Sequence, residues 1–307
     1  MSQQDSTESK QSSRSRVVGE APGAFAYDEP IVTRPKWPAW LRIAVLPVLM
    51  LASTLSPVIF GVIPGYADFV RSFQPDSLQR NLFNAVPILL APLTAILFVW
   101  LLVRFVDGMR LRDVGFTFDR RTLPTLVVGY VAMMVISLAV SLATQAAGWN
   151  RPPEGSFVDF WGGLLMVGLG MGLIYQGFPE EFYWRGYGMA TLRDHPERAV
   201  WITGAIFGAM HIASAGGQEN QFERIIYVVH AFAFAMLAGA LALALRSMWA
   251  AVGVHAGLHL GNYLMGYAGI GSGPAQWAIE SVVLVAVAVV IMRRWSAGRP
   301  TTAGVTA

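Results

Sequence analysis

The chain of 307 residues contains eight apolar stretches that are separated by short polar stretches, and this pattern restricts the folds open to it. A helix needs about 20 apolar residues to cross the hydrocarbon core of a bilayer, and several stretches are somewhat shorter. Short stretches are expected where a helix is broken or begins inside the protein near a site. The sequence predicts an all-α, polytopic membrane helix bundle of about eight transmembrane helices. The stretches cover residues 40–63, 85–105, 123–147, 160–175, 199–212, 225–245, 249–267 and 277–292.

The composition also indicates a membrane protein. Hydrophobic residues make up 54% of the chain and charged residues only 13%, against about 25% charged residues in soluble domains. The absence of cysteine excludes disulfide bonds, thiolate metal sites and a cysteine nucleophile. The basic residues form no stripe and no separate domain, so we expect the lipid bilayer as a partner and no nucleic acid.

The ends of the chain differ in composition from the apolar middle. Residues 1–37 are predicted to be a disordered cytoplasmic tail, residues 38–295 the transmembrane domain, and residues 296–307 a second cytoplasmic tail. Eight crossings would place eighteen of the 22 lysines and arginines on the side of the two termini. Because positive residues favour the cytoplasmic side, both termini should be cytoplasmic. We expect an integral protein of a bacterial plasma membrane.

Ionisable side chains at membrane depth are the main functional signal in this chain. An intramembrane charge costs about 2.5–3.5 kcal/mol on an insertion scale, so such residues usually line an internal polar site. Glu181 and Arg185 are four residues apart and can pair on one helical face. Glu180 points about 100° away and lacks that partner. An unpaired carboxylate in a dry site suits a general base, whereas the alternative is an ordinary Glu-Arg pair at the membrane boundary.

Four of the five histidines lie in or next to apolar stretches. His255 and His259 are four residues apart on one helical face, and Asn262 follows one turn later. Together with His211 they could supply an imidazole partner for a carboxylate base and donors for an oxyanion. They could equally form a three-His or two-His-one-Glu zinc site. We interpret His230 as structural.

These observations give a geometric expectation. Glu180, His211, His255 and His259 should line one cavity, which we expect below the cytoplasmic surface. Gly168 and Gly172, four residues apart, would let another membrane helix approach closely. The chain has no His-Glu-x-x-His helix and no Gly-x-Ser-x-Gly, so a zincin and a serine hydrolase are disfavoured.

Three motifs in order resemble those of the CPBP intramembrane proteases. That family includes the type II CAAX prenyl endopeptidases and the bacteriocin-processing or self-immunity proteins. The resemblance covers a protease-like core at about residues 160–266. The motifs are Glu180-Glu181-x-x-x-Arg185, Phe207-x-x-x-His211 and His255-x-x-x-His259.

The resemblance implies an endopeptidase that cuts a membrane-associated protein or peptide, of which a prenylated CAAX protein is one candidate. Glu180 would activate water, and His211 would help to hold that water. The last motif position is often Asn in the family but is His259 here, so zinc as a cofactor stays open. The residues that would support the base, line the site or stabilise the oxyanion are Glu181, Arg185, His255 and His259.

Two other functions are compatible with the sequence. The chain could be a non-catalytic scaffold or immunity protein with the same fold, or a proton-coupled transporter. Retention of all motif positions favours the enzyme over the scaffold. The absence of an internal repeat disfavours the transporter.

Overall fold

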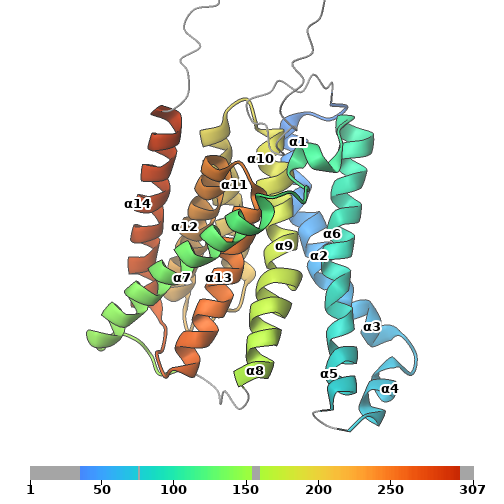
Figure 1. The fold of residues 1–307 in the computed structure, drawn as a ribbon, viewed down its shortest axis with the longest axis vertical. Helices are drawn as coiled ribbons and strands as arrows, with labels where there is room; N and C mark the ends of the chain where they lie inside the picture. Colours follow the sequence, from blue (N-terminus) through green and yellow to red (C-terminus); the bar gives the residue numbers. More distant parts are fainter. Residues whose placement is uncertain (1–34, 75–76, 154–159, 298–307) are drawn as a thin grey trace, which may run out of the picture.

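The computed structural model describes residues 35–74, 77–153 and 160–297, which form a bundle of helices (Figure 1). Within these ranges the only β-type pairing is an isolated bridge between Arg151 and Ser272. The predicted all-α membrane bundle is confirmed. The predicted disordered tails lie almost entirely outside the described residues.

The N-terminal part contains three long helical spans. Several of their junctions coincide with proline, which lacks a backbone donor and is tolerated in the first turn of a helix. The elements are α1 (Ala39–Ala44), α2 (Leu46–Leu55), the 3₁₀ turn η1 (Ser56–Val58), α3 (Ile59–Val62), α4 (Tyr66–Ser72), α5 (Leu78–Ala85), the 3₁₀ turn η2 (Val86–Leu89), α6 (Leu90–Leu101), the π-helical η3 (Leu102–Asp107), the 3₁₀ turn η4 (Leu111–Val114) and α7 (Thr122–Ala146).

The C-terminal part begins with a span in which α-helical and π-helical turns alternate, and continues with four simpler helices. The elements are α8 (Phe160–Gly163), the π-helical η5 (Leu164–Tyr175), α9 (Gly177–Glu181), the π-helical η6 (Phe182–Gly188), α10 (Met189–Thr191), α11 (Pro196–Met210), the 3₁₀ turn η7 (His211–Ala213), α12 (Gln221–Leu245), α13 (Met248–Tyr267) and α14 (Pro274–Ala297).

Six helical spans among the described residues are long and apolar enough to cross a membrane. Two further helices correspond to predicted apolar stretches but fall outside this group. One is α11, with 15 residues, and the other is α13, whose histidines and Asn262 lower its hydropathy. These two helices carry His211 and the His255/His259 pair. The six spans are Ala39–Val62, Leu82–Asp107, Thr122–Ala146, Phe160–Thr191, Gln221–Leu245 and Pro274–Ala297.

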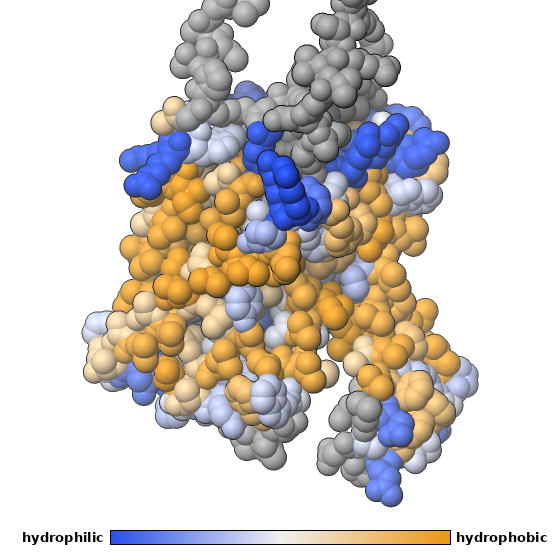
Figure 2. Space-filling view, viewed as in Figure 1, coloured by the Kyte–Doolittle hydropathy of each residue, from blue (hydrophilic) through white to orange (hydrophobic). Residues whose placement is uncertain are grey.

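The burial pattern shows which helices form the core. Helix α12 from His230 to Leu243 and the first half of α13 are almost continuously buried, whereas the outer spans expose large apolar side chains such as Val48, Val135 and Val282. Figure 2 shows these apolar residues as a broad band between more hydrophilic ends. An exposed apolar surface of this extent is typical of a protein that is solvated by lipid.

The beginning of α1 and the end of α14 lie at the same end of the bundle (Figure 1). Helix α14 has 24 residues, or about 36 Å at 1.5 Å per residue, so its first residue lies near the opposite end. The segments between η7 and α12 and between α13 and α14 are at that opposite end. We call it the distal face, and the end at which α1 begins and α14 ends the terminal face.

Close approaches at glycines hold α13 between the fourth span and α7. A Cβ atom on Gly172 would come within 2.9 Å of the His259 Cβ, and one on Gly168 within 3.2 Å of Leu260. A Cβ atom on Gly253 would lie 2.0 Å from the Leu126 carbonyl oxygen. Only residues without side chains allow backbones to approach this closely, so the predicted contact at Gly168 and Gly172 is present.

Candidate active site

The fourth span changes its helical form at the Glu-Glu pair. The π-helical η5 ends before Gln176, and α9 begins at Gly177 with Pro179 as its third residue. The expected interruption by glycine and proline is therefore observed as a change of helical winding within one continuous span. Wide π-helical turns are frequent at functional sites. Here they place Glu180 and Glu181 in a short α-helical segment between two π-helical ones.

Glu181 is held by two partners, one of which was predicted. Its Oε2 lies 2.9 Å from Arg185 Nη1, and both side chains are fully buried. Its Oε1 accepts a hydrogen bond of 3.0 Å from Nδ1 of His255. Arg185 also donates to the Ala235 carbonyl oxygen at 2.8 Å and lies over the Phe207 ring. Glu181 thus orients His255 and ties α9 to α13.

Glu180 has a different environment. Its side chain is buried, with 7% of its surface exposed, and it makes no hydrogen bond or ion pair to any described residue. It contributes to the lining of a cavity. A buried carboxylate normally has a partner, so this one is available for a bound water or ligand.

The three motif histidines present different atoms to this cavity. Nδ1 of His211 lies 2.8 Å from the Phe207 carbonyl oxygen and donates to it, which leaves Nε2 of the neutral ring as an acceptor. Nδ1 of His255 donates to Glu181, so its Nε2 is likewise an acceptor in the neutral ring. His259 stacks on His255 with ring centroids 5.2 Å apart. No described residue accepts from or donates to its ring.

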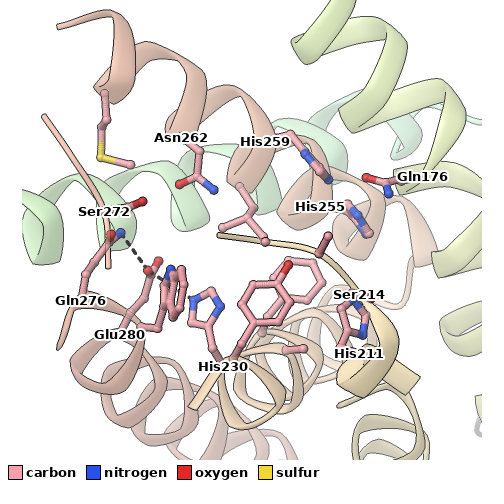
Figure 3. Close-up of a pocket in the computed structure, with 18 of the residues that line it drawn as sticks. Gln176, His211, Ser214, His230, His255, His259, Asn262, Ser272, Gln276 and Glu280 are labelled. Atoms are coloured by element: carbon pink, nitrogen blue, oxygen red, sulfur yellow. Dashed lines mark hydrogen bonds and ion pairs between the residues drawn. The ribbon is translucent and has the colours of Figure 1, made fainter. Parts of the chain in front are cut away.

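One cavity of about 500 Å³ is lined by four of the six predicted site residues: Glu180, His211, His255 and His259. Figure 3 shows the two stacked histidines on one wall near Gln176, with His211 on a neighbouring wall. Glu181 and Arg185 do not line the cavity and lie behind it. Asn262 also lines it, one turn after His259 as the helical spacing indicated.

The side on which the cavity opens differs from our expectation. Its rim includes residues 214–216 and 270–272 at the distal face, and no described residue from the connections 192–195 and 246–247 at the terminal face. The physical reason is packing, because residues 177–190 and 248–257 are buried without a break and close the terminal end. The cavity therefore lies below the distal face, at the opposite end of the bundle from the start of α1 and the end of α14.

Sequence reasoning missed part of the lining. Gln176, Tyr227, Gln276 and Glu280 face the same cavity. Glu280 lies inside the last apolar stretch, so the argument from intramembrane carboxylates could have found it. The other three carry no such signal, since uncharged polar and aromatic residues are common in membrane helices. His230, which we interpreted as structural, also lines the cavity.

The described residues do not fit a zinc site. No group of three or more His, Cys, Asp or Glu side chains among them is arranged to hold a metal ion, whereas zinc sites use three or four such ligands. We therefore derive no step through a metal.

The structure is an all-α membrane bundle in which one carboxylate and three imidazoles of the predicted site line one cavity. Residues 160–261 match the family described as type II CAAX prenyl endopeptidase Rce1-like. The chain thus carries an Rce1-like domain, and the resemblance to the CPBP proteases is confirmed over this segment. In general terms the match supports an intramembrane protease of the CAAX type. No curated protein matches the chain.

Proposed function

We propose that the chain is an intramembrane endopeptidase in which Glu180 and His211 activate a water molecule. One observation carries this proposal. Glu180 is a buried, unpartnered carboxylate on a cavity wall, while the adjacent Glu181 forms an ion pair with Arg185 and a hydrogen bond with His255. Two neighbouring carboxylates in such different environments suit different roles, the first as a base and the second as a support.

The proposed reaction needs no group beyond the substrate, water and these side chains. The Glu180 carboxylate accepts a proton as the water oxygen attacks the peptide carbonyl carbon. Nε2 of His211 accepts a hydrogen bond from the same water and fixes its position. The C–N bond of the tetrahedral intermediate then breaks. The proton held by Glu180 passes to the leaving amine, which leaves one carboxylic acid and one amine.

His259 is the best candidate for the oxyanion donor. The neutral ring of His255 has its only N–H directed at Glu181, so it cannot also donate to the substrate. The ring of His259 makes no hydrogen bond with any described residue and keeps an N–H for a developing oxyanion. Donors of this kind are typically worth a factor of about 10²–10³ in rate.

The substrate can be sought by comparing the membrane fractions of cells that produce the wild type or Glu180→Ala. We expect at least one membrane-associated protein to be shortened only with the wild type. Glu197→Ala is the matched control, because Glu197 is exposed at the start of α11. A proteome that is identical in all three strains would favour the non-catalytic scaffold.

We also propose that both termini are cytoplasmic, so that the cavity opens on the outer side. This proposal is supported by the lysine and arginine count, since eight crossings would place eighteen of the 22 on the side of the two termini. A substrate would then enter from the outer face or from within the bilayer. A prenylated CAAX protein of the cytoplasm would not reach the cavity from its own side.

Single-cysteine labelling tests this orientation, since the chain has no cysteine of its own. Ser272→Cys lies exposed on the cavity rim and Asp194→Cys lies exposed in the connection between α10 and α11. A membrane-impermeant maleimide should label Ser272→Cys in intact cells and label Asp194→Cys only after the membrane is opened. The reverse pattern would place the cavity on the cytoplasmic side.

His259→Asn separates the metal-free reaction from a metal-dependent one. Asparagine supplies an N–H donor but is a poor zinc ligand. We expect the rate of cleavage by His259→Asn to stay within about tenfold of the wild-type rate and to be unaffected by chelators. His259→Ala has no donor, so its rate should fall by a factor of about 10²–10³. Loss of cleavage in His259→Asn, together with chelator inhibition that zinc reverses, would contradict the proposed reaction.

A further inference from the structure

A second polar cluster lies in the same cavity, away from Glu180. Glu280 and Gln276 come from α14, Ser137 from α7 and His230 from α12. The Ser137 hydroxyl donates to Glu280 Oε1. Gln276 Nε2 lies 3.3 Å from Glu280 Oε2 and 2.8 Å from the Ser141 hydroxyl. Figure 3 shows this cluster at the other end of the cavity from His255 and His259.

The cluster is buried but incompletely satisfied. Glu280 is 1%, Gln276 2% and His230 6% exposed. His230 Nε2 and Gln276 Oε1 have no hydrogen-bond partner among the described residues. His230 Nε2 lies 3.3 Å from Glu280 Oε2, but not in a geometry that makes a hydrogen bond. Buried polar atoms without partners are costly, by about 1–3 kcal/mol each, so their retention points to a ligand.

The charge of the cluster indicates which ligand. Glu280 forms no ion pair with a lysine or arginine among the described residues. Its hydrogen-bond donors, Ser137 and Gln276, are neutral. The unsatisfied Gln276 Oε1 is a further acceptor. A buried carboxylate beside a free acceptor is best completed by a group that donates several hydrogen bonds and carries a positive charge.

We propose that His230, Gln276 and Glu280 form a subsite that binds a cationic group of the substrate, namely the side chain of lysine or arginine or an amino terminus. This inference depends on the proposed hydrolysis in one respect only, namely that the bound ligand is the substrate. The lining of the subsite does not include the proposed base. Its role is to position the substrate, and it takes no part in bond cleavage.

The distance from the subsite to His211, which would hold the attacking water, restricts where the cationic group lies in the substrate. The centroid of the Tyr227 ring is 6.1 Å from that of His211 and 6.5 Å from that of His230, so the two histidine rings are no farther apart than these two distances together. An extended chain advances about 3.3–3.6 Å per residue. The cationic residue should therefore lie within about four positions of the bond that is cut.

Peptide binding to the purified full chain in lipid nanodiscs tests the subsite without requiring cleavage. The probes are fluorescent apolar peptides, identical except for one lysine, norleucine or glutamate, each with a free or an acetylated amino terminus. Charge-assisted hydrogen bonds in buried sites predict that the lysine peptide binds about ten to a hundredfold more tightly than the norleucine peptide. Preference for the free amino terminus over the internal lysine would assign the site to an amino terminus.

Glu280→Gln should remove the preference for lysine, whereas Glu197→Gln at the exposed start of α11 should retain it. Equal binding of the lysine and norleucine peptides to the wild type would contradict the proposed subsite. This comparison uses the wild type alone, so it does not depend on whether Glu280→Gln folds. Because binding is measured directly, a protein that prefers lysine but cleaves nothing would contradict the proposed hydrolysis and leave the subsite intact. With a cleavable peptide, Glu280→Gln should raise KM and leave kcat unchanged.

Discussion

Glu180→Gln is expected to lower the rate of peptide cleavage by a factor of about 10²–10⁴, the usual contribution of a general base. The glutamine side chain has nearly the same size as glutamate but cannot accept the proton of the attacking water. Because the Glu180 side chain makes no hydrogen bond or ion pair to any described residue, the change should leave the fold intact. The measurement is kcat for a cleavable peptide, together with the unfolding temperature of the same preparation.

Two further variants make this result specific. His211→Ala removes the acceptor that fixes the water and should reduce cleavage to a similar extent. Glu197→Gln makes the same chemical change as Glu180→Gln at an exposed position and should cleave at the wild-type rate. Wild-type cleavage by Glu180→Gln would mean that another group activates the water.

Arg185→Met is expected to lower the free energy of unfolding by about 3–5 kcal/mol, the usual cost of removing one partner of a buried ion pair. The change leaves the Glu181 carboxylate fully buried without its cation and also removes the bond to the Ala235 carbonyl. Methionine fills much of the space that the arginine side chain occupies, so the loss of stability would be mainly electrostatic. The free energy can be measured by reversible denaturation in mixed micelles.

The control is Arg198→Met, because Arg198 is exposed near the start of α11 and should change stability by less than about 0.5 kcal/mol. Adding Glu181→Gln to Arg185→Met removes the unpaired charge as well. The double variant should therefore be more stable than the sum of the two single changes predicts. Strict additivity would show that the two side chains do not form the pair that their 2.9 Å separation indicates.

Local spacing predicted several contacts of the site correctly. The Glu181–Arg185 pair follows from a separation of four residues, since such side chains meet on one helical face. The separation of His255 and His259 likewise predicted neighbouring rings. In each case both residues belong to one helical span, so the chain itself sets their distance.

The individual side-chain contacts between helices were not predicted by this reasoning. The bond from His255 to Glu181 joins residues 74 positions apart. It depends on how closely α13 approaches the fourth span at Gly172. The Glu280–Ser137 contact joins α14 to α7, and no pattern within either helix indicates it. The cavity's opening at the distal face depends on which end of the bundle packs tightly, which involves residues from several helices at once.

The sequence by itself determined that the chain is an all-α membrane bundle, because the length and apolarity of each stretch set its cost of transfer into lipid. It also placed Glu180, Glu181, Arg185 and four of the histidines in or next to apolar stretches, and it predicted which of them share a helical face. Only the tertiary structure decided that His255 is the second partner of Glu181, and that His230 and Glu280 share the cavity. Those outcomes depend on packing between helices, and the distances between helices are fixed by contacts far apart in the chain.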